Sequence, residues 1–156
     1  MNPAELLAAA RAKSLRFALA ESCTGGMVSA ALTDIPGSSD VVECGFVTYS
    51  NQAKIRHLGV SEGTIEEYGA VSEETAVEMA SGALQQSRAD IAVSVTGIAG
   101  PGGSDFKPEG RVCFGIATAT TASAETIDFG ALGRDKVRQA SVAHALKLLA
   151  DATDTY

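Results

Sequence analysis

Short apolar runs alternate with amphipathic stretches along most of the chain. The apolar runs are rich in Ala, Val, Ile and Phe and end at polar or glycine-containing segments, which is typical of buried strands. The last two runs are joined by a polar turn and therefore predict a β-hairpin. In all, strands are predicted at residues 16–20, 41–49, 91–95, 111–119 and 125–129.

The stretches between these runs carry the start signals of helices. Asn2 and Pro3 begin the first helix, because asparagine is a favoured cap and proline suits the first helical position. Ser72 is followed by two glutamates, which favour the positive end of a helix. Helices are predicted at residues 3–14, 24–32, 61–68, 72–88 and 135–150, and a further one starts at Ser50 or Asn51.

Helices alternate with buried strands over the first two thirds of the chain, and a β-β pair follows. This order predicts one domain over residues 1–156, an α/β/α sandwich with a mixed, mostly parallel sheet and helices on both faces. A chain of 156 residues with 46% hydrophobic residues can bury one compact core. Aromatic residues make up only 5%, so Ala, Val, Ile and Leu must build that core.

Composition also excludes several classes of partner. The net charge of −7 argues against a nucleic-acid backbone, because binding to that backbone needs clustered cations. No apolar run approaches the roughly 20 residues that span a bilayer, and the N-terminus opens a helix rather than a signal peptide. The three cysteines lack the spacing of a zinc site. We therefore expect a cytoplasmic protein with reduced thiols, no membrane contact, no metal and no cofactor.

The most informative segment is residues 17–26, where an apolar run ends in Glu21 and Ser22 and two glycines follow. This order places Ser22 where a strand leads into a helix. A hydroxyl there can attack a carbonyl while the backbone N–H groups of residues 24–26 bind the resulting oxyanion. The competing interpretation is that Ser22 or Thr24 merely caps the helix, since both residue types are favoured caps.

A second polar segment, residues 48–54, also follows a predicted strand. If the two strands are neighbours, its Tyr49 and Lys54 would meet Ser22 at one edge of the sheet. Burial or a nearby cation can lower the pKa of a lysine enough for it to accept the proton of a serine. The competing interpretation is a solvated Lys54 on a helix face, the commoner place for lysine.

A third segment, residues 96–104, begins with Thr96 and Gly97 and contains four glycines. Such a composition favours either a loop that binds a ligand or a loop that is merely flexible. Farther along, Arg134, Lys136 and Arg138 form a basic cluster at the start of the last predicted helix. Guanidinium groups bind phosphate in a bidentate manner, so this cluster is a candidate anion site.

Four segments, taken together and in this order, resemble the C-terminal domain family of the competence/damage-inducible protein CinA. The likeness extends over nearly the whole chain, from Ala4 to Ala150. The segments are Glu21-Ser22-Cys23-Thr24-Gly25-Gly26, Thr48-Tyr49-Ser50-Asn51-Gln52-Ala53-Lys54, Gly69-Ala70-Val71-Ser72 and Val95-Thr96-Gly97-Ile98-Ala99-Gly100-Pro101-Gly102-Gly103.

Stand-alone members of that family are nicotinamide mononucleotide deamidases, so the resemblance implies one amidohydrolase domain over residues 1–156. The implied reaction hydrolyses the carboxamide of nicotinamide mononucleotide and gives nicotinic acid mononucleotide and ammonia. The resemblance makes Ser22 the nucleophile, adds Tyr49 and Lys54 as catalytic residues, and requires no metal or cofactor.

The resemblance also implies a contact from Thr96 and a phosphate contact from Arg134 or Arg138. The chain has Leu132-Gly133 where members often carry Gly-Asp, so the local loop is expected to differ. Two alternatives stay open, a non-catalytic nucleotide-binding module and an amidase for another small amide, and a homo-oligomer is compatible with this Ala-rich domain. The predicted substrate-binding residues are Thr24, Gly25, Gly26, Thr96, Gly97, Arg134 and Arg138.

Overall fold

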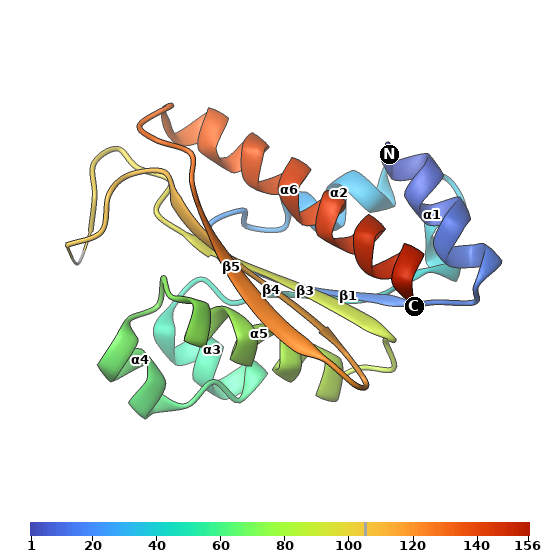
Figure 1. Cartoon of the computed structure of the whole chain (residues 1–156), viewed down its shortest axis with the longest axis horizontal. Coiled ribbons are helices and arrows are strands. Elements are labelled where there is room, and N and C mark those ends of the chain that lie inside the picture. The colour runs from blue at the N-terminus through green and yellow to red at the C-terminus, as the bar shows by residue number, and fades with distance from the viewer. Residues whose placement is uncertain (105) are drawn as a thin grey trace.

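The computed structural model describes residues 1–104 and 106–156, and within them five strands form one sheet with helices on both faces (Figure 1). The strand order is β2-β1-β3-β4-β5. The β2–β1 and β1–β3 pairs are parallel, whereas β3–β4 and β4–β5 are antiparallel. The predicted α/β sandwich with a mixed sheet is thus confirmed. The strands are β1 (Phe17–Glu21), β2 (Val42–Val47), β3 (Ile91–Gly97), β4 (Arg111–Thr118) and β5 (Ala122–Asp128).

The helices form two layers around this sheet (Figure 1). One layer contains α1 (Pro3–Ala12), α2 (Met27–Thr33) and α6 (Arg134–Thr155), which contact one another. The other contains α3 (Asn51–Leu58), α4 (Glu62–Tyr68) and α5 (Glu73–Gln85), of which α5 packs across four strands of the sheet. A 3₁₀ helix, η1 (Ser38–Asp40), leads into β2.

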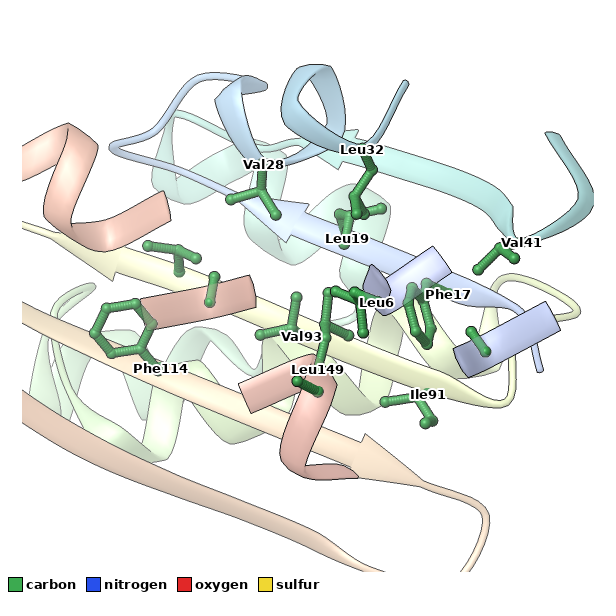
Figure 2. Close-up of a cluster of buried hydrophobic side chains, with 14 of the residues drawn as sticks. Leu6, Phe17, Leu19, Val28, Leu32, Val41, Ile91, Val93, Phe114 and Leu149 are labelled. Atoms are coloured by element: carbon green, nitrogen blue, oxygen red, sulfur yellow. The ribbon is translucent and has the colours of Figure 1, made fainter. Parts of the chain in front are cut away.

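The core is built mainly from aliphatic side chains, as the composition predicts. All five residues of β1 are buried, because β1 lies between two strands and two helical layers. On the α6 side, Phe17 and Leu19 of β1 pack with Leu6 of α1 and Leu149 of α6 (Figure 2). On the α5 side, small residues of β1 and β3 pack against Met79. The centre of the sheet is therefore held from both faces.

The helix boundaries follow the predicted caps, with one exception at the start of α2. Asn2 forms a capping box with Glu5, as the first turn of α1 predicts. The helix predicted from residue 24, however, begins only at Met27. Gly25 and Gly26 adopt positive φ angles of 59° and 109°, so they form a left-handed turn ahead of the helix. These glycines therefore serve the turn that follows Ser22 rather than the helix interior.

Smaller differences occur at the ends of other elements. β5 starts at Ala122, three residues before the predicted strand, because the turn between the hairpin strands is tight. α6 continues to Thr155, beyond the predicted end at Ala150. Within the described part of the chain, none of the helices combines the length and apolarity needed to cross a bilayer.

The close packing of α5 against the end of α3 gives a test of the fold. A Cβ atom added at Gly82 would lie 1.8 Å from the backbone oxygen of Leu58. We expect Gly82→Ala to lower the free energy of unfolding by about 2 kcal/mol, because overpacking here outweighs the helix propensity of alanine. Urea denaturation measures the change. Gly63→Ala in α4 is the matched control, since its Cβ would meet nothing nearer than 3.6 Å.

Gly63→Ala is expected to leave the free energy of unfolding unchanged or to raise it by a few tenths of a kcal/mol. Equal effects of the two substitutions would show that α5 and α3 are not packed this closely.

Candidate active site

The carboxyl ends of the three parallel strands lie at one edge of the sheet, and each leads directly into a polar loop. The pairing continues past β1, because Ser22 N–H donates to the carbonyl of Val95 at 2.9 Å. On the other side, Thr48 N–H donates to the carbonyl of Glu21 at 2.9 Å. Three segments that are distant in sequence therefore meet at this edge, where ligands bind in open α/β sheets.

Lys54 and Ser22 contact each other directly at this edge. The Lys54 Nζ atom lies 3.0 Å from Ser22 Oγ, and it donates to the carbonyls of Thr48 and Tyr49 at 2.9 and 3.3 Å. Lys54 is 1% exposed and Ser22 is 8% exposed. Within the described residues, Lys54 forms no ion pair with a carboxylate. All three oxygens that surround the amine are neutral.

This environment changes the acidity of the amine. Burial lowers the pKa of Lys54 from its ordinary value to about 8, because the charged form loses water without gaining a counter-ion. An appreciable fraction of the amine is therefore uncharged near neutral pH. An uncharged lysine within hydrogen-bonding distance of a serine hydroxyl can accept its proton.

The sequence around Lys54 explains how its side chain reaches the sheet edge. Ser50 caps α3 by accepting a hydrogen bond from Ala53 N–H at 3.0 Å. Lys54 follows one turn later, and long helical side chains point back toward the N-terminus of their helix. Its amine consequently reaches the carbonyls of Thr48 and Tyr49 and the residue that follows β1.

Glu21 holds the start of α2, the helix that follows Ser22 and its turn. The sequence analysis missed this role. Its buried carboxylate accepts hydrogen bonds from the N–H groups of Val28 and Ser29 at 2.8 and 3.0 Å. It also accepts one from Ser29 Oγ at 2.8 Å. These bonds satisfy free N–H groups at the start of α2. A carboxylate that ends an apolar strand just before a helix was the available signal.

Arg138 braces the same turn from α6. Its Nε atom donates to the carbonyl of Cys23 at 3.0 Å, and Nη2 donates to that of Thr24 at 3.3 Å. A Cβ atom at Gly25 would lie 3.3 Å from Nη2, so the guanidinium lies against this turn. Arg138 thus binds the main chain next to Ser22, whereas the sequence analysis considered it as a phosphate ligand.

A cavity of about 330 Å³ opens over the serine–lysine pair. This volume is within the range of pockets that bind small molecules. Of the predicted site residues, Ser22, Tyr49, Lys54, Thr96, Gly97 and Arg134 line the cavity. Thr24, Gly25, Gly26 and Arg138 do not line it. Thr24 is completely buried. The remaining lining residues are Cys23, Asn51, Ala70, Val71, Ile98–Ser104 and Lys107.

Arg134 spans two walls of this cavity. It donates through Nη2 to the hydroxyl of Tyr49 at 3.0 Å and through Nη1 to the carbonyl of Gly100 at 2.8 Å. Tyr49 is 61% exposed, so its ring lies at the rim and not in the core. The first residue of α6 thereby places a permanent positive charge beside a cavity that also contains the serine–lysine pair.

The glycine-rich loop forms the wall opposite Tyr49. Gly102 N–H donates to the carboxylate of Glu109 at 2.6 Å, which ties the two arms of the loop together. Gly100 has a φ of 92°, and a Cβ there would collide with Glu109. Thr96 at the base of the loop donates through Oγ1 to the carbonyl of Ala70 at 2.8 Å. The loop is therefore bonded to its surroundings at several points.

Cys23 lies beside Ser22 and also borders the cavity. Burial raises the pKa of its thiol to about 11. Since the thiolate is the reactive form, burial disfavours the reactive state of Cys23 near neutral pH. Among residues 1–104 and 106–156, no group of three or more His, Cys, Asp and Glu side chains is arranged to hold a metal ion. Of the Ser22 hydroxyl and the neighbouring Cys23 thiol, only the hydroxyl contacts the Lys54 amine.

The sheet and the cavity together define the class of this molecule, an α/β protein with a buried serine–lysine pair at the carboxyl edge of parallel strands. The family model of the CinA C-terminal domain matches residues 2–153. The chain therefore belongs to the CinA C-terminal domain family.

Relatives within this family differ in length. The chain is 51% identical over 142 residues to the nicotinamide-nucleotide amidohydrolase PncC of Escherichia coli K12, a match that covers 90% of this chain and 86% of that protein. It is 58% identical over 110 residues to a CinA-like protein of Chloroherpeton thalassium, covering 70% of this chain but only 26% of that relative. The chain thus spans about a quarter of some relatives and most of others.

Solved structures share the whole fold. The crystal structure of the competence/damage inducible protein CihA from Agrobacterium tumefaciens aligns with a TM-score of 0.93 at 45% identity, covering 97% of this chain and 93% of that one. A CinA superfamily protein from Escherichia coli aligns with a TM-score of 0.90 at 37% identity, covering 95% and 87%.

Proposed function

We propose that this chain is a nicotinamide-nucleotide amidohydrolase, which converts nicotinamide mononucleotide into nicotinic acid mononucleotide and ammonia. One observation carries the proposal, the 3.0 Å contact between Ser22 Oγ and the buried Lys54 amine at the wall of a cavity. The high identity to the Escherichia coli amidohydrolase supports this choice of substrate.

The first half of the proposed reaction transfers the acyl group to the protein. Uncharged Lys54 accepts the hydroxyl proton while Ser22 Oγ forms a bond to the carboxamide carbon, and the carbonyl electrons move onto oxygen. Protonated Lys54 then gives this proton to the amide nitrogen. The oxyanion collapses, the C–N bond breaks and ammonia leaves. The acyl group stays bound to Ser22 Oγ as an ester.

The second half returns the protein to its starting state. A water molecule attacks the ester carbon and loses a proton to Lys54, which forms a second oxyanion. When this collapses, the bond to Ser22 Oγ breaks and Lys54 returns its proton to that oxygen. The product acid ionises to nicotinic acid mononucleotide. The same amine thus acts as base and acid in both halves.

Substrate binding is assigned to the residues that line the cavity. Arg134 is the proposed phosphate ligand, because it is the predicted arginine that borders the cavity. Tyr49 holds that guanidinium through its hydroxyl, and Thr96 and Gly97 form the wall next to the nucleophile. Contacts to substrate from residues 24–26 stay predictions, as do the oligomeric state and the cytoplasmic location.

Replacing the nucleophile tests the proposal directly. We expect Ser22→Ala to lower ammonia release from nicotinamide mononucleotide by at least about 1,000-fold, because no other hydroxyl of residues 1–104 and 106–156 contacts the Lys54 amine. The thermal unfolding midpoint should change little, since Ser22 is a small residue at the cavity wall. Cys23→Ala is the companion variant and should retain most of the activity. Full turnover by Ser22→Ala would remove Ser22 from this role.

A substrate panel separates the proposed function from its two alternatives. Ammonia is measured with nicotinamide mononucleotide, nicotinamide riboside and nicotinamide. An amidase for another small amide would show no preference for the phosphorylated compound. A non-catalytic binding module would be stabilised against heat by the nucleotide but would release no ammonia.

The acidity of Lys54 predicts the pH dependence of the reaction. Because the uncharged amine is the reactive form and its pKa is about 8, kcat/KM should fall about tenfold for each pH unit below that value. Above it, kcat/KM should reach a plateau as the amine becomes fully deprotonated. Ammonia release between about pH 6.5 and about pH 9.5 measures this profile. A flat profile over that range would contradict Lys54 as the base.

The two arginines should give different kinetic signatures. Arg134→Gln is expected to raise KM for nicotinamide mononucleotide about tenfold with little change in kcat, because a charge-assisted contact to phosphate is lost. KM for nicotinamide riboside, which lacks the phosphate, should stay the same. Arg138→Gln should instead lower kcat and the unfolding midpoint, since Arg138 binds the carbonyls beside Ser22. The reverse pattern would assign the phosphate to Arg138.

A further inference from the structure

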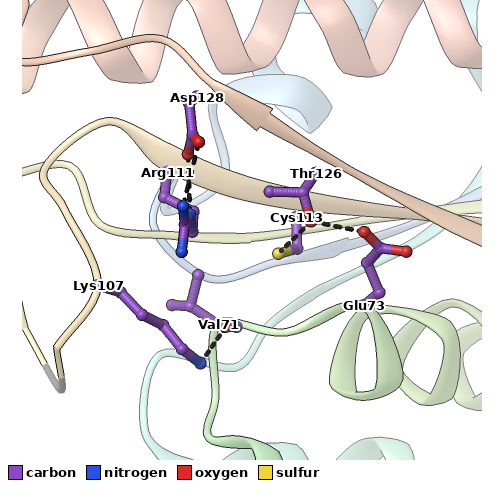
Figure 3. A network of polar contacts seen from close by, with 7 residues as sticks. All are labelled: Val71, Glu73, Lys107, Arg111, Cys113, Thr126 and Asp128. Carbon is purple, nitrogen blue, oxygen red and sulfur yellow. Dashed lines mark hydrogen bonds and ion pairs between the residues drawn. The ribbon is translucent and has the colours of Figure 1, made fainter.

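Residues 68–71, which run from the last residue of α4 toward the start of α5, are held by side chains at every backbone carbonyl. Lys107 reaches this segment from the loop that follows the glycine-rich wall. Its Nζ atom donates to the carbonyl of Tyr68 at 2.7 Å. The same atom donates to the carbonyl of Val71, as Figure 3 shows. One lysine thus secures both ends of the segment.

The two carbonyls in the middle are held by hydroxyl groups. Ser72 Oγ and Thr75 Oγ1, at the start of α5, donate to the carbonyl of Gly69 at 3.0 and 2.8 Å. Thr96 Oγ1, at the end of β3, donates to the carbonyl of Ala70 at 2.8 Å. The orientation of each peptide group in this segment is therefore fixed.

The N–H group of Ala70 is left without an acceptor among the described residues, although Ala70 lines the cavity. The Gly69–Ala70 peptide is trans, so this N–H points opposite to the Gly69 carbonyl. That carbonyl points to the start of α5. The N–H is therefore directed away from the start of α5, and the residue that carries it borders the cavity.

Register places Thr96, which holds the carbonyl of Ala70, beside Ser22. Glu21 pairs with Val95, so the next residues, Ser22 and Thr96, are neighbours on strands about 4.8 Å apart. Thr96 in turn holds the carbonyl of Ala70. The carbonyl of Ala70 is therefore bonded to the strand residue beside Ser22, and the Ala70 N–H belongs to the preceding peptide group.

We propose that the backbone N–H of Ala70 donates a hydrogen bond to the oxyanion formed when Ser22 attacks the carboxamide. This inference rests on the proposed function. A donor fixed before the reaction stabilises the developing charge without reorganising. Ser72, Thr75 and Lys107 act as positioning residues, because they hold the carbonyls that orient this peptide.

This assignment replaces the donors predicted from the sequence at residues 24–26. In the structure, Gly25 N–H donates to the carbonyl of Ser22 at 3.0 Å. Neither Gly25 nor Gly26 lines the cavity. Ala70, in contrast, combines an unbonded N–H with a place in the cavity wall.

Replacing the Ala70 amide by an ester tests the proposal, since lactic acid in place of alanine removes the N–H and keeps the side chain. With nicotinamide mononucleotide as substrate, we expect kcat to fall about 100-fold while KM changes less than about twofold. Stability should change little, because this N–H has no partner within the described residues. An ester at Gly63, on the exposed start of α4, is the matched control and should keep wild-type kinetics.

Two further proteins make the result unambiguous. An ester at Ala70 also weakens the Gly69 carbonyl as an acceptor, so Thr75→Val measures that effect alone by deleting one hydroxyl bonded to it. The fall in kcat should be much smaller for Thr75→Val than for the Ala70 ester. An equal loss, or an Ala70 ester with kcat within about threefold of wild type, would overturn the proposal. The proposal would also be overturned if an ester at Gly26 lowered kcat while the ester at Ala70 did not.

Activity of the unmodified protein separates this inference from the function on which it rests. If the wild-type chain releases no ammonia from nicotinamide mononucleotide, the proposed function fails before any ester is compared. If it does release ammonia, the esters test the oxyanion donor alone.

Discussion

The candidate site depends on one buried amine that forms no ion pair within the part of the chain that the structure describes. An ammonium group transferred from water into a protein interior is strongly disfavoured unless it is paired. Lys54 gains only neutral oxygens as partners, including Ser22 Oγ and the carbonyl of Thr48. Burial of this amine therefore lowers the stability of the fold, and the same burial makes the amine give up its proton easily. Any carboxylate placed beside it would restore the charge and remove the base.

Strand order is what allows this contact to form. β1 lies between β2 and β3, so the segments that follow all three strands emerge side by side. One helical layer then delivers the amine through α3, and the other delivers two guanidinium groups through the first turns of α6. Glu21 and Arg138 keep the intervening turn in place from opposite sides. The site is thus assembled from elements on both faces of the sheet.

Much of this arrangement could be predicted from the sequence, because strand ends and glycine-rich loops have recognisable patterns. Ser22, Lys54 and Thr96 each follow an apolar run, and parallel strands bring such positions to one edge. The separate positions of Arg134 and Arg138 could not be predicted, since one turn of helix decides which of them faces the cavity. Ala70 was not predicted as a donor either, because its N–H is oriented by bonds to neighbouring carbonyls that no sequence pattern reports.

The raised pKa of the Cys23 thiol has a consequence for how the protein responds to oxidants and alkylating agents. Peroxides and alkylating agents attack sulfur mainly in its ionised form. Cys23, although next to Ser22, keeps its proton at neutral pH because it is buried. Beside Ser22 the protein thus carries a thiol that burial keeps in the form that oxidants attack slowly.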